Sequence, residues 1–218
     1  DLANLDTEKV KEYVRGDDGT EVTLTILSNK KTNEIKVTRG ALDTSAFYEI
    51  RKQGNTSFGY IELSTFGTDT ANQVEEALKS FKQANVQTLV LDLRDNGGGY
   101  LTAATDILDL FFTSDEVIYQ MKEKNSAAKK YYAESDKKYE FENGYILVNE
   151  NTASASELTA GALQSEKGYQ LIGKTTYGKG SAQTQKTLSD GSVLKYTYAK
   201  WMIPNGTCIN GKGLTPDE

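Results

Sequence analysis

The chain has 218 residues, 37% of them hydrophobic and 10% aromatic, which is enough to form a core and excludes wholesale disorder. Its net charge of −6 is spread over mixed signs and offers no basic face for nucleic acid. The lack of histidine and the single cysteine, Cys208, exclude a Ser-His-Asp triad, a Cys-His dyad, an internal disulfide and any multi-cysteine metal site.

No run of about 18 apolar residues is present, so we expect no segment to cross a membrane. We expect no signal peptide within these residues either. The chain begins with Asp in the middle of a pattern, and we expect it to be part of a longer protein.

Residues 1–40 have the pattern of a small unit. Apolar spacing after Asp6 and Thr7, either of which can cap a helix, predicts one short helix. Alternating residues at 22–27 and 34–38 predict a hairpin. One helix and one hairpin bury too little to form a core alone, so this unit either docks on the rest or lacks its other half.

From about Phe47 the pattern becomes α/β. Strands are predicted at 58–63, 88–93, 145–149 and 169–173, and helices at 70–82, 101–111 and 154–164. The pair Thr70 and Gln73 matches a capping box for the first of these helices. Strands that alternate with helices predict a layered α/β domain.

Two further segments predict an added antiparallel portion. Residues 114–142 are polar and rich in Lys and Tyr, and we expect a hairpin or a flap there. The stretch SDGS at 189–192, between Leu188 and the strand pattern at 193–198, is a strong hairpin signal.

Ser154, in the stretch NTASASE, is predicted to lie where a buried strand stops and a helix starts. A hydroxyl there is next to the unpaired N–H groups and positive end of the helix, and the N–H of Ala155 would face a developing oxyanion. Ordinary helix capping explains the same serine, and Ser156 or Thr152 would serve equally well as the cap.

Lys179 lies between Gly178 and Gly180, which allow the backbone to approach another element closely. A lysine that acts as a base has to be neutral, which requires burial in apolar surroundings. The alternative is an ordinary surface lysine on a loop.

The stretch DLRDNGGG at 92–99 is either a plain loop or a turn that offers free backbone N–H groups to an anion. It lacks the spacing of a P-loop, and its N–H groups suit an oxyanion as well as a phosphate. Asp92, Arg94 and Asp95 are expected to form a local ion-pair cluster.

Together these blocks resemble the carboxyl-terminal processing peptidases, also called tail-specific proteases, of the S41 family of serine endopeptidases. LVLDLRDNGGG, VNENTASASELTAGALQ, YGKGSAQT and INGKGLTPD are similar to the blocks of that family and occur in the same order. The step of 25 residues from Ser154 to Lys179 also matches. The resemblance implies a crotonase/ClpP-like layered β-α core over 41–218, preceded by the C-terminal half of a PDZ domain over 1–40.

The resemblance also implies the site residues. Ser154 is then the nucleophile, Lys179 the general base that takes its proton, and Gln183 the residue that holds the lysine in place. The oxyanion hole is then formed by the N–H of Ala155 with that of Gly97 or Gly98. No cofactor and no metal is implied.

The function implied is that of a serine endopeptidase that cleaves proteins or peptides with exposed C-termini near those ends. The expected location is outside the cytoplasm, at a bacterial cell envelope, with membrane association only through segments absent from this chain. Two alternatives stay open: a non-catalytic PDZ-type scaffold that binds peptides, and a crotonase-like acyl-transfer enzyme.

Overall fold

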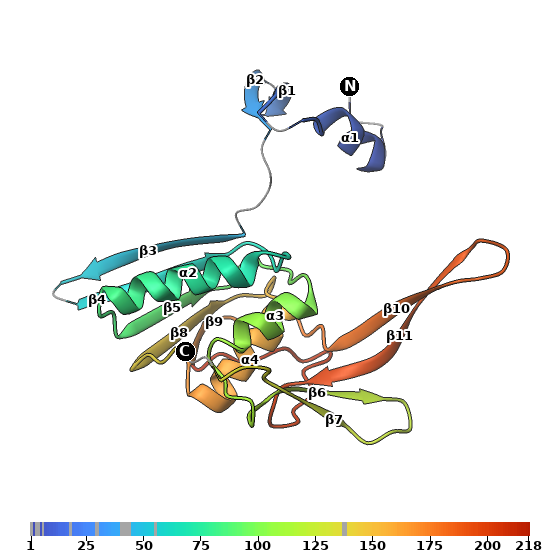
Figure 1. Cartoon of the computed structure of the whole chain (residues 1–218). Helices are drawn as coiled ribbons and strands as arrows, with labels where there is room; N and C mark the ends of the chain where they lie inside the picture. The colour runs from blue at the N-terminus through green and yellow to red at the C-terminus, as the bar shows by residue number, and fades with distance from the viewer. Residues whose placement is uncertain are drawn as a thin grey trace. The chain divides into compact units, whose positions relative to one another are not determined.

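The computed structural model describes residues 2, 5, 7–17, 19–28, 31–39, 45–54, 56–136 and 139–218 (Figure 1). The chain divides into two compact units, 1–43 and 44–218. The sequence predicted a boundary after residue 40.

The first unit consists of one helix and one hairpin. Helix α1 spans Thr7–Val14, and strands β1, Glu21–Ser28, and β2, Lys31–Thr38, pair antiparallel. The Arg39 side chain ties them together, because its Nε donates to the Val14 carbonyl at 2.8 Å and its Nη1 to the Glu21 carbonyl at 3.0 Å. The predicted helix and hairpin are confirmed, whereas Asp6 and the turn residues 29–30 lie outside the described residues.

The second unit is built on a five-stranded sheet in the order β3-β4-β5-β8-β9. Its strands are β3, Ala46–Gln53; β4, Thr56–Leu63; β5, Thr88–Asp92; β8, Asn143–Val148; and β9, Gln170–Gly173. Strand β3 runs antiparallel to β4, and the other neighbours are parallel. Parallel strands end at one edge of the sheet, so the loops after β5 and β8 come together there.

Three helices cover one face of this sheet (Figure 1). They are α2, Thr70–Gln83; α3, Leu101–Leu108; and α4, Ala155–Lys167. The core lies between them and the sheet, and the ring of Phe81 on α2 is fully buried. It lies directly over Gly59 of β4, where any side chain would come within 2.3 Å of the ring. Glycine at 59 therefore sets how closely α2 approaches the sheet.

A second, antiparallel sheet has the order β10-β11-β6-β7. Its strands are β6, Val117–Glu123; β7, Lys129–Tyr132; β10, Ser181–Thr187; and β11, Val193–Met202. The β10–β11 hairpin projects from the domain in Figure 1. Its register shifts between Ala182 and Gln183, where β11 carries one extra residue, and such a bulge redirects nearby side chains.

The α/β fold with an added antiparallel portion is thus confirmed, including the two predicted hairpins. The capping box is wrong. Asp69 occupies the N-cap position of α2 without a side-chain cap hydrogen bond, and Gln73 Oε1 instead accepts the N–H groups of Ser45 and Ala46, which fixes the start of β3. Strand β3 has no counterpart in the sequence prediction. None of the helices in the described part of the chain is long and apolar enough to cross a membrane.

Candidate active site

Ser154 occupies the N-cap position of α4 in an unusual backbone conformation, with φ 59° and ψ −117°. A non-glycine residue held there stores about 1–3 kcal/mol of strain, which persists only where the surroundings impose it. The two alternative capping hydroxyls are used elsewhere: Thr152 donates to the Leu93 carbonyl at 2.8 Å and Ser156 to the Asn96 carbonyl at 3.0 Å. They fasten the loop before α4 and the first turn of α4 to the loop after β5.

The glycine run after β5 packs directly on this serine. A Cβ added to Gly98, whose φ is +95°, would lie 2.9 Å from the Ser154 Cβ and 2.7 Å from the Ala153 carbonyl oxygen. Buried Asn96 holds the run in place, because its Nδ2 donates to the Leu63 carbonyl at 2.7 Å and its Oδ1 accepts the Gly98 N–H at 2.9 Å. Only glycine fits at position 98 without displacing the serine.

These contacts bear on the expected oxyanion hole, which stays a prediction. The Gly98 N–H is already bound to Asn96, and Gly97 is exposed and outside the pocket lining. Gly99 does line the pocket, beside Ala155. Neither the Gly99 N–H nor the Ala155 N–H has an acceptor among the described residues. The amides available to an oxyanion are therefore those of Ala155 and Gly99.

A single buried carboxylate connects Ser154 to the loop of residues 176–180, which carries Lys179 and is called the lysine loop below. Glu157 is 0% exposed and accepts four hydrogen bonds. Its Oε2 accepts the N–H of Ser154 and the N–H of Lys179, each at 2.9 Å. Its Oε1 accepts the Gly178 N–H at 2.7 Å and the Thr176 hydroxyl at 2.6 Å. The main chain at both predicted catalytic residues is thus anchored on one side chain.

The glycines that flank Lys179 allow the close approach expected of them. Gly178 has φ +86°, and a Cβ there would lie 2.8 Å from the Gly213 nitrogen, while one on Gly180 would lie 2.8 Å from the Asn210 nitrogen. The Gly178 carbonyl accepts the N–H of Gly211 at 2.8 Å. The segment INGKG, residues 209–213, therefore packs against the lysine loop and supports it.

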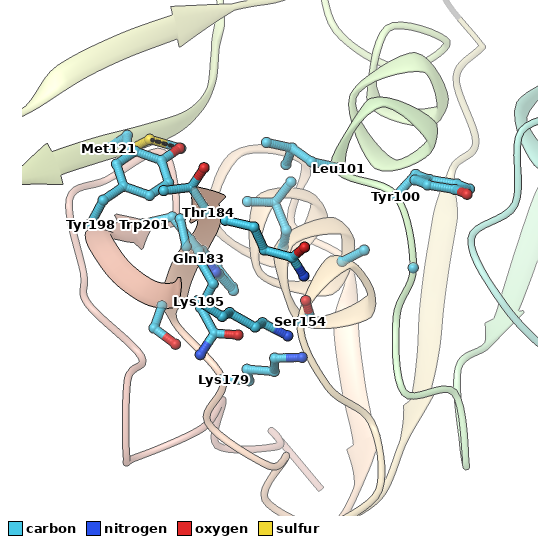
Figure 2. Close-up of a pocket in the computed structure, with 16 residues that line it drawn as sticks. Tyr100, Leu101, Met121, Ser154, Lys179, Gln183, Thr184, Lys195, Tyr198 and Trp201 are labelled. Atoms are coloured by element: carbon cyan, nitrogen blue, oxygen red, sulfur yellow. Dashed lines mark hydrogen bonds between the residues drawn. The ribbon is translucent and has the colours of Figure 1, made fainter. Parts of the chain in front are cut away.

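A pocket of about 730 Å³ brings the predicted residues together. Ser154, Ala155, Lys179 and Gln183 all line it, and Figure 2 shows the Lys179 side chain directed toward Ser154. The rest of the lining is contributed by Gly99, Tyr100, Leu101, Met121, Leu158, Ser181, Ala182, Thr184, Gln185, Lys195, Tyr198 and Trp201. Helix α4, the loop after β5 and the second sheet thus share one cavity.

The expectation of a buried Lys179 is wrong for this structure. Lys179 and Gln183 are both exposed, and Ser154 is half-buried. Among the described residues no hydrogen bond joins Lys179 to the hydroxyl of Ser154 or to Gln183. The physical reason is that only the main chain of Lys179 is anchored, by Glu157, whereas its side chain extends into an open pocket.

The acidic residues at the end of β5 and in the loop after it form two separate clusters. Asp92 pairs with Arg94 and accepts the Tyr60 hydroxyl at 2.7 Å, as expected of an ion pair, but Asp95 accepts the side-chain amides of Asn149 and Asn151. Burial alone would raise the pKa of Asp92, yet the hydrogen bonds from Arg94 and Tyr60 outweigh it and hold that pKa below the usual value. Burial, with the bond to Asp92, raises the pKa of Tyr60 to about 12.

Three residues of the site were missed: Glu157, Asn96 and Thr176. Glu157 stands three residues after Ser154, the spacing of a capping box, so the serine motif did contain a signal for it. The bond that Asn96 accepts from the Gly98 N–H is local, whereas the bonds that join Asn96 to Leu63 and Thr176 to Glu157 connect distant residues and have no local pattern. Within the described residues, no three His, Cys, Asp or Glu side chains gather in a way that would hold a metal ion.

Comparisons with known proteins show which family the chain resembles in sequence and fold. The sequence model of peptidase family S41 matches residues 57–218. The chain is 36% identical over 212 residues to the "Probable CtpA-like serine protease" of Staphylococcus haemolyticus, covering 96% of this chain and 42% of that protein. It is 35% identical over 219 residues to the carboxy-terminal processing protease CtpB of Bacillus subtilis, covering 99% and 45%.

Among solved structures, the fold is similar to that of the photosystem II D1 C-terminal processing protease, with a TM-score of 0.71, 26% identity, and coverage of 96% of this chain and 57% of that one. The chain spans less than half the length of these curated relatives. The family match covers most of the chain, and on that ground the chain belongs to peptidase family S41.

Proposed function

We propose that this chain is the catalytic part of a serine endopeptidase that works through a Ser154–Lys179 dyad. The observation that carries the proposal is the placement of both residues in one pocket by one carboxylate, since Glu157 accepts the N–H groups of each. The family match and the protease names of the relatives support the reaction class.

The proposed reaction begins when the Ser154 hydroxyl attacks the scissile carbonyl. Lys179, in its neutral form, takes the hydroxyl proton and later gives it to the leaving amine. The N–H groups of Ala155 and Gly99 stabilise the oxyanion, with help from the positive end of α4. Water then hydrolyses the acyl-enzyme. Gln183, at the bulge of the β10–β11 hairpin, orients Lys179 when the pocket closes.

Because the Lys179 side chain is exposed, the proposed mechanism requires a change in the pocket before Lys179 can act as the base. Only a neutral amine can accept the hydroxyl proton, and loss of contact with water favours the neutral form, so the reaction requires water to be excluded from the pocket when substrate binds. An extended peptide across the pocket opening would cover Lys179 and bring it to the Ser154 hydroxyl. We therefore propose that substrate itself, or segments outside this chain, completes the site.

The finer parts of the function rest on the relatives. Cleavage near substrate C-termini is proposed because the names of two relatives describe C-terminal processing. A location at the bacterial cell envelope is proposed from the same bacterial relatives. We also propose that residues 1–40 are the second half of a PDZ domain; their helix and hairpin are compatible with that identity.

The test is intact-mass spectrometry after exposure to a fluorophosphonate, which reacts with activated serines. Wild type is expected to gain one adduct, and Ser154→Ala and Lys179→Ala none. Lys186→Ala is the matched control, because Lys186 lies on β10, the strand that follows Lys179, but outside the pocket lining. An adduct that persists in Ser154→Ala, or a Lys179→Ala variant labelled at the wild-type rate, would refute the dyad.

A further inference from the structure

A second lysine reaches the active-site pocket. Lys195 lies on β11 directly opposite Gln185 of β10, and both residues line the pocket with Ser154. In Figure 2 the Lys195 side chain extends from the hairpin toward Ser154, as that of Lys179 does. The proposed dyad leaves this lysine without a role.

The charges around Lys195 are unbalanced. The pocket lining contains two lysines and no Asp or Glu, although the chain as a whole has a net charge of −6. Among the described residues Lys195 takes part in no ion pair. A concave site whose charges are all positive attracts anions, so the pocket favours a ligand that carries a negatively charged group.

We propose that Lys195 is a specificity-determining residue that binds a carboxylate of the peptide substrate. This inference rests on the proposed peptidase function and adds the charge of the substrate to it. The neighbouring lining supplies the other half of the recognition, because Leu101, Met121, Leu158 and Trp201 offer an apolar surface to an adjacent side chain. The preferred substrate segment therefore carries an apolar residue and a carboxylate close together.

The position of Lys195 limits where that carboxylate lies. Thr197, two residues along β11, is paired with Gln183, and Gln185 is paired with Lys195. A strand rises about 3.4 Å per residue, so Lys195 lies about 7 Å further along the hairpin than Gln183. An extended peptide covers the same distance in two residues. Because the lysine side chain extends back toward Ser154, the carboxylate lies within about four residues of the scissile bond.

A carboxylate at that distance has two sources: an Asp or Glu side chain, or the free C-terminus of the substrate. One peptide series distinguishes them. Starting from a neutral peptide that is cleaved, Glu and Gln are compared at each of the four positions on either side of the cut. The terminal carboxylic acid is compared with the amide in peptides that end two, three or four residues after the cut.

Wild type is expected to favour the charged member of one such pair about 5-fold in kcat/KM, mainly through KM, which is the range of a partly exposed ion pair. Lys195→Met reduces this ratio to about 1, and Lys195→Glu shifts the preference toward Lys at the same position. Lys186→Met keeps the wild-type ratio, because Lys186 faces Leu194 outside the pocket lining. A ratio that is equal in wild type and Lys195→Met would overturn the inference.

A binding measurement tests the role of Lys195 independently of whether the protein cleaves peptides. Trp201 is the single tryptophan of the chain and lines the pocket, so its fluorescence reports peptide binding to Ser154→Ala. If charged peptides bind more tightly and Lys195→Met removes the difference, Lys195 has the proposed role even where wild type shows no turnover and the peptidase proposal fails. The peptidase proposal stands and this inference fails if turnover requires Ser154 and Lys179 but Lys195→Met leaves the effect of peptide charge on binding and on kcat/KM unchanged.

Discussion

Replacing Glu157 by glutamine tests whether one carboxylate holds the site together. The four hydrogen bonds that Glu157 accepts are 2.6–2.9 Å long, two on each oxygen. Glutamine replaces one oxygen by an NH₂ group, so two buried donors lose their acceptor. Each costs about 1–3 kcal/mol, and we expect Glu157→Gln to lower the free energy of unfolding by about 2–6 kcal/mol. For a chain of this size that lowers Tm by about 5–20 °C.

Urea unfolding followed by Trp201 fluorescence measures the stability, and the rate of fluorophosphonate labelling measures the geometry at Ser154. Labelling is expected to slow at least about 10-fold, because small displacements of a reacting group have large effects on rate. Glu166→Gln is the control: it removes an exposed carboxylate from the same helix and should change stability by less than about 0.5 kcal/mol. Wild-type stability together with wild-type labelling in Glu157→Gln would refute the reasoning.

Three other substitutions test separate parts of the structure. Gly98→Ala should abolish labelling of Ser154 because the new methyl group would lie 2.9 Å from the Ser154 Cβ, whereas Gly97→Ala, with open space around it, should be labelled normally; equal labelling of the two contradicts the contact. The folded-state pKa of Asp92 lies below its unfolded value, so its carboxylate stabilises the fold above about pH 4, and this stability is lost as pH falls through the folded pKa. The Tm advantage of wild type over Asp92→Asn should therefore shrink between about pH 5 and pH 2 in thermal scans, and a constant difference would argue against the assignment. Phe81→Ala should cost about 3–5 kcal/mol in urea unfolding, against less than about 1 kcal/mol for the exposed Phe47→Ala, and similar losses would mean that α2 does not depend on its contact with Gly59.

Most of the second unit could be predicted because its elements have buried faces with a regular period. Helix α2 shows this, since Val74, Ala77, Leu78 and Phe81 are all buried as their spacing predicts. Strand β3 lacks such a face: apart from half-buried Ala46 it is exposed along its whole length, as an edge strand that alternates apolar and charged residues can be. Pairing with β4 and the hydrogen bonds from Ser45 and Ala46 to Gln73 define it, and both are tertiary contacts.

The sequence predicted those residues of the candidate site that belong to local motifs. The serine at a strand-to-helix junction and the lysine between two glycines were both found, and the structure places them in one pocket. The sequence left both a buried and an exposed Lys179 open, because the exposure of this side chain depends on what covers the pocket. The sequence also did not predict that the Gly98 N–H donates a hydrogen bond to the side chain of Asn96. Motifs identify reacting groups, whereas solvation and hydrogen-bond partners depend on the assembled fold.

The anchoring of Ser154 and Lys179 through main-chain N–H groups has a consequence for protein engineering. Every residue except proline carries such a group, so the placement of this loop depends little on the side chains along it, apart from Thr176 and the glycines. Tyr177, between two anchored positions, is 67% exposed. Tyr177 can therefore be varied while Ser154 and Lys179 keep their positions, and Lys195 is the residue of the pocket lining at which a library would be a starting point for redirecting selectivity.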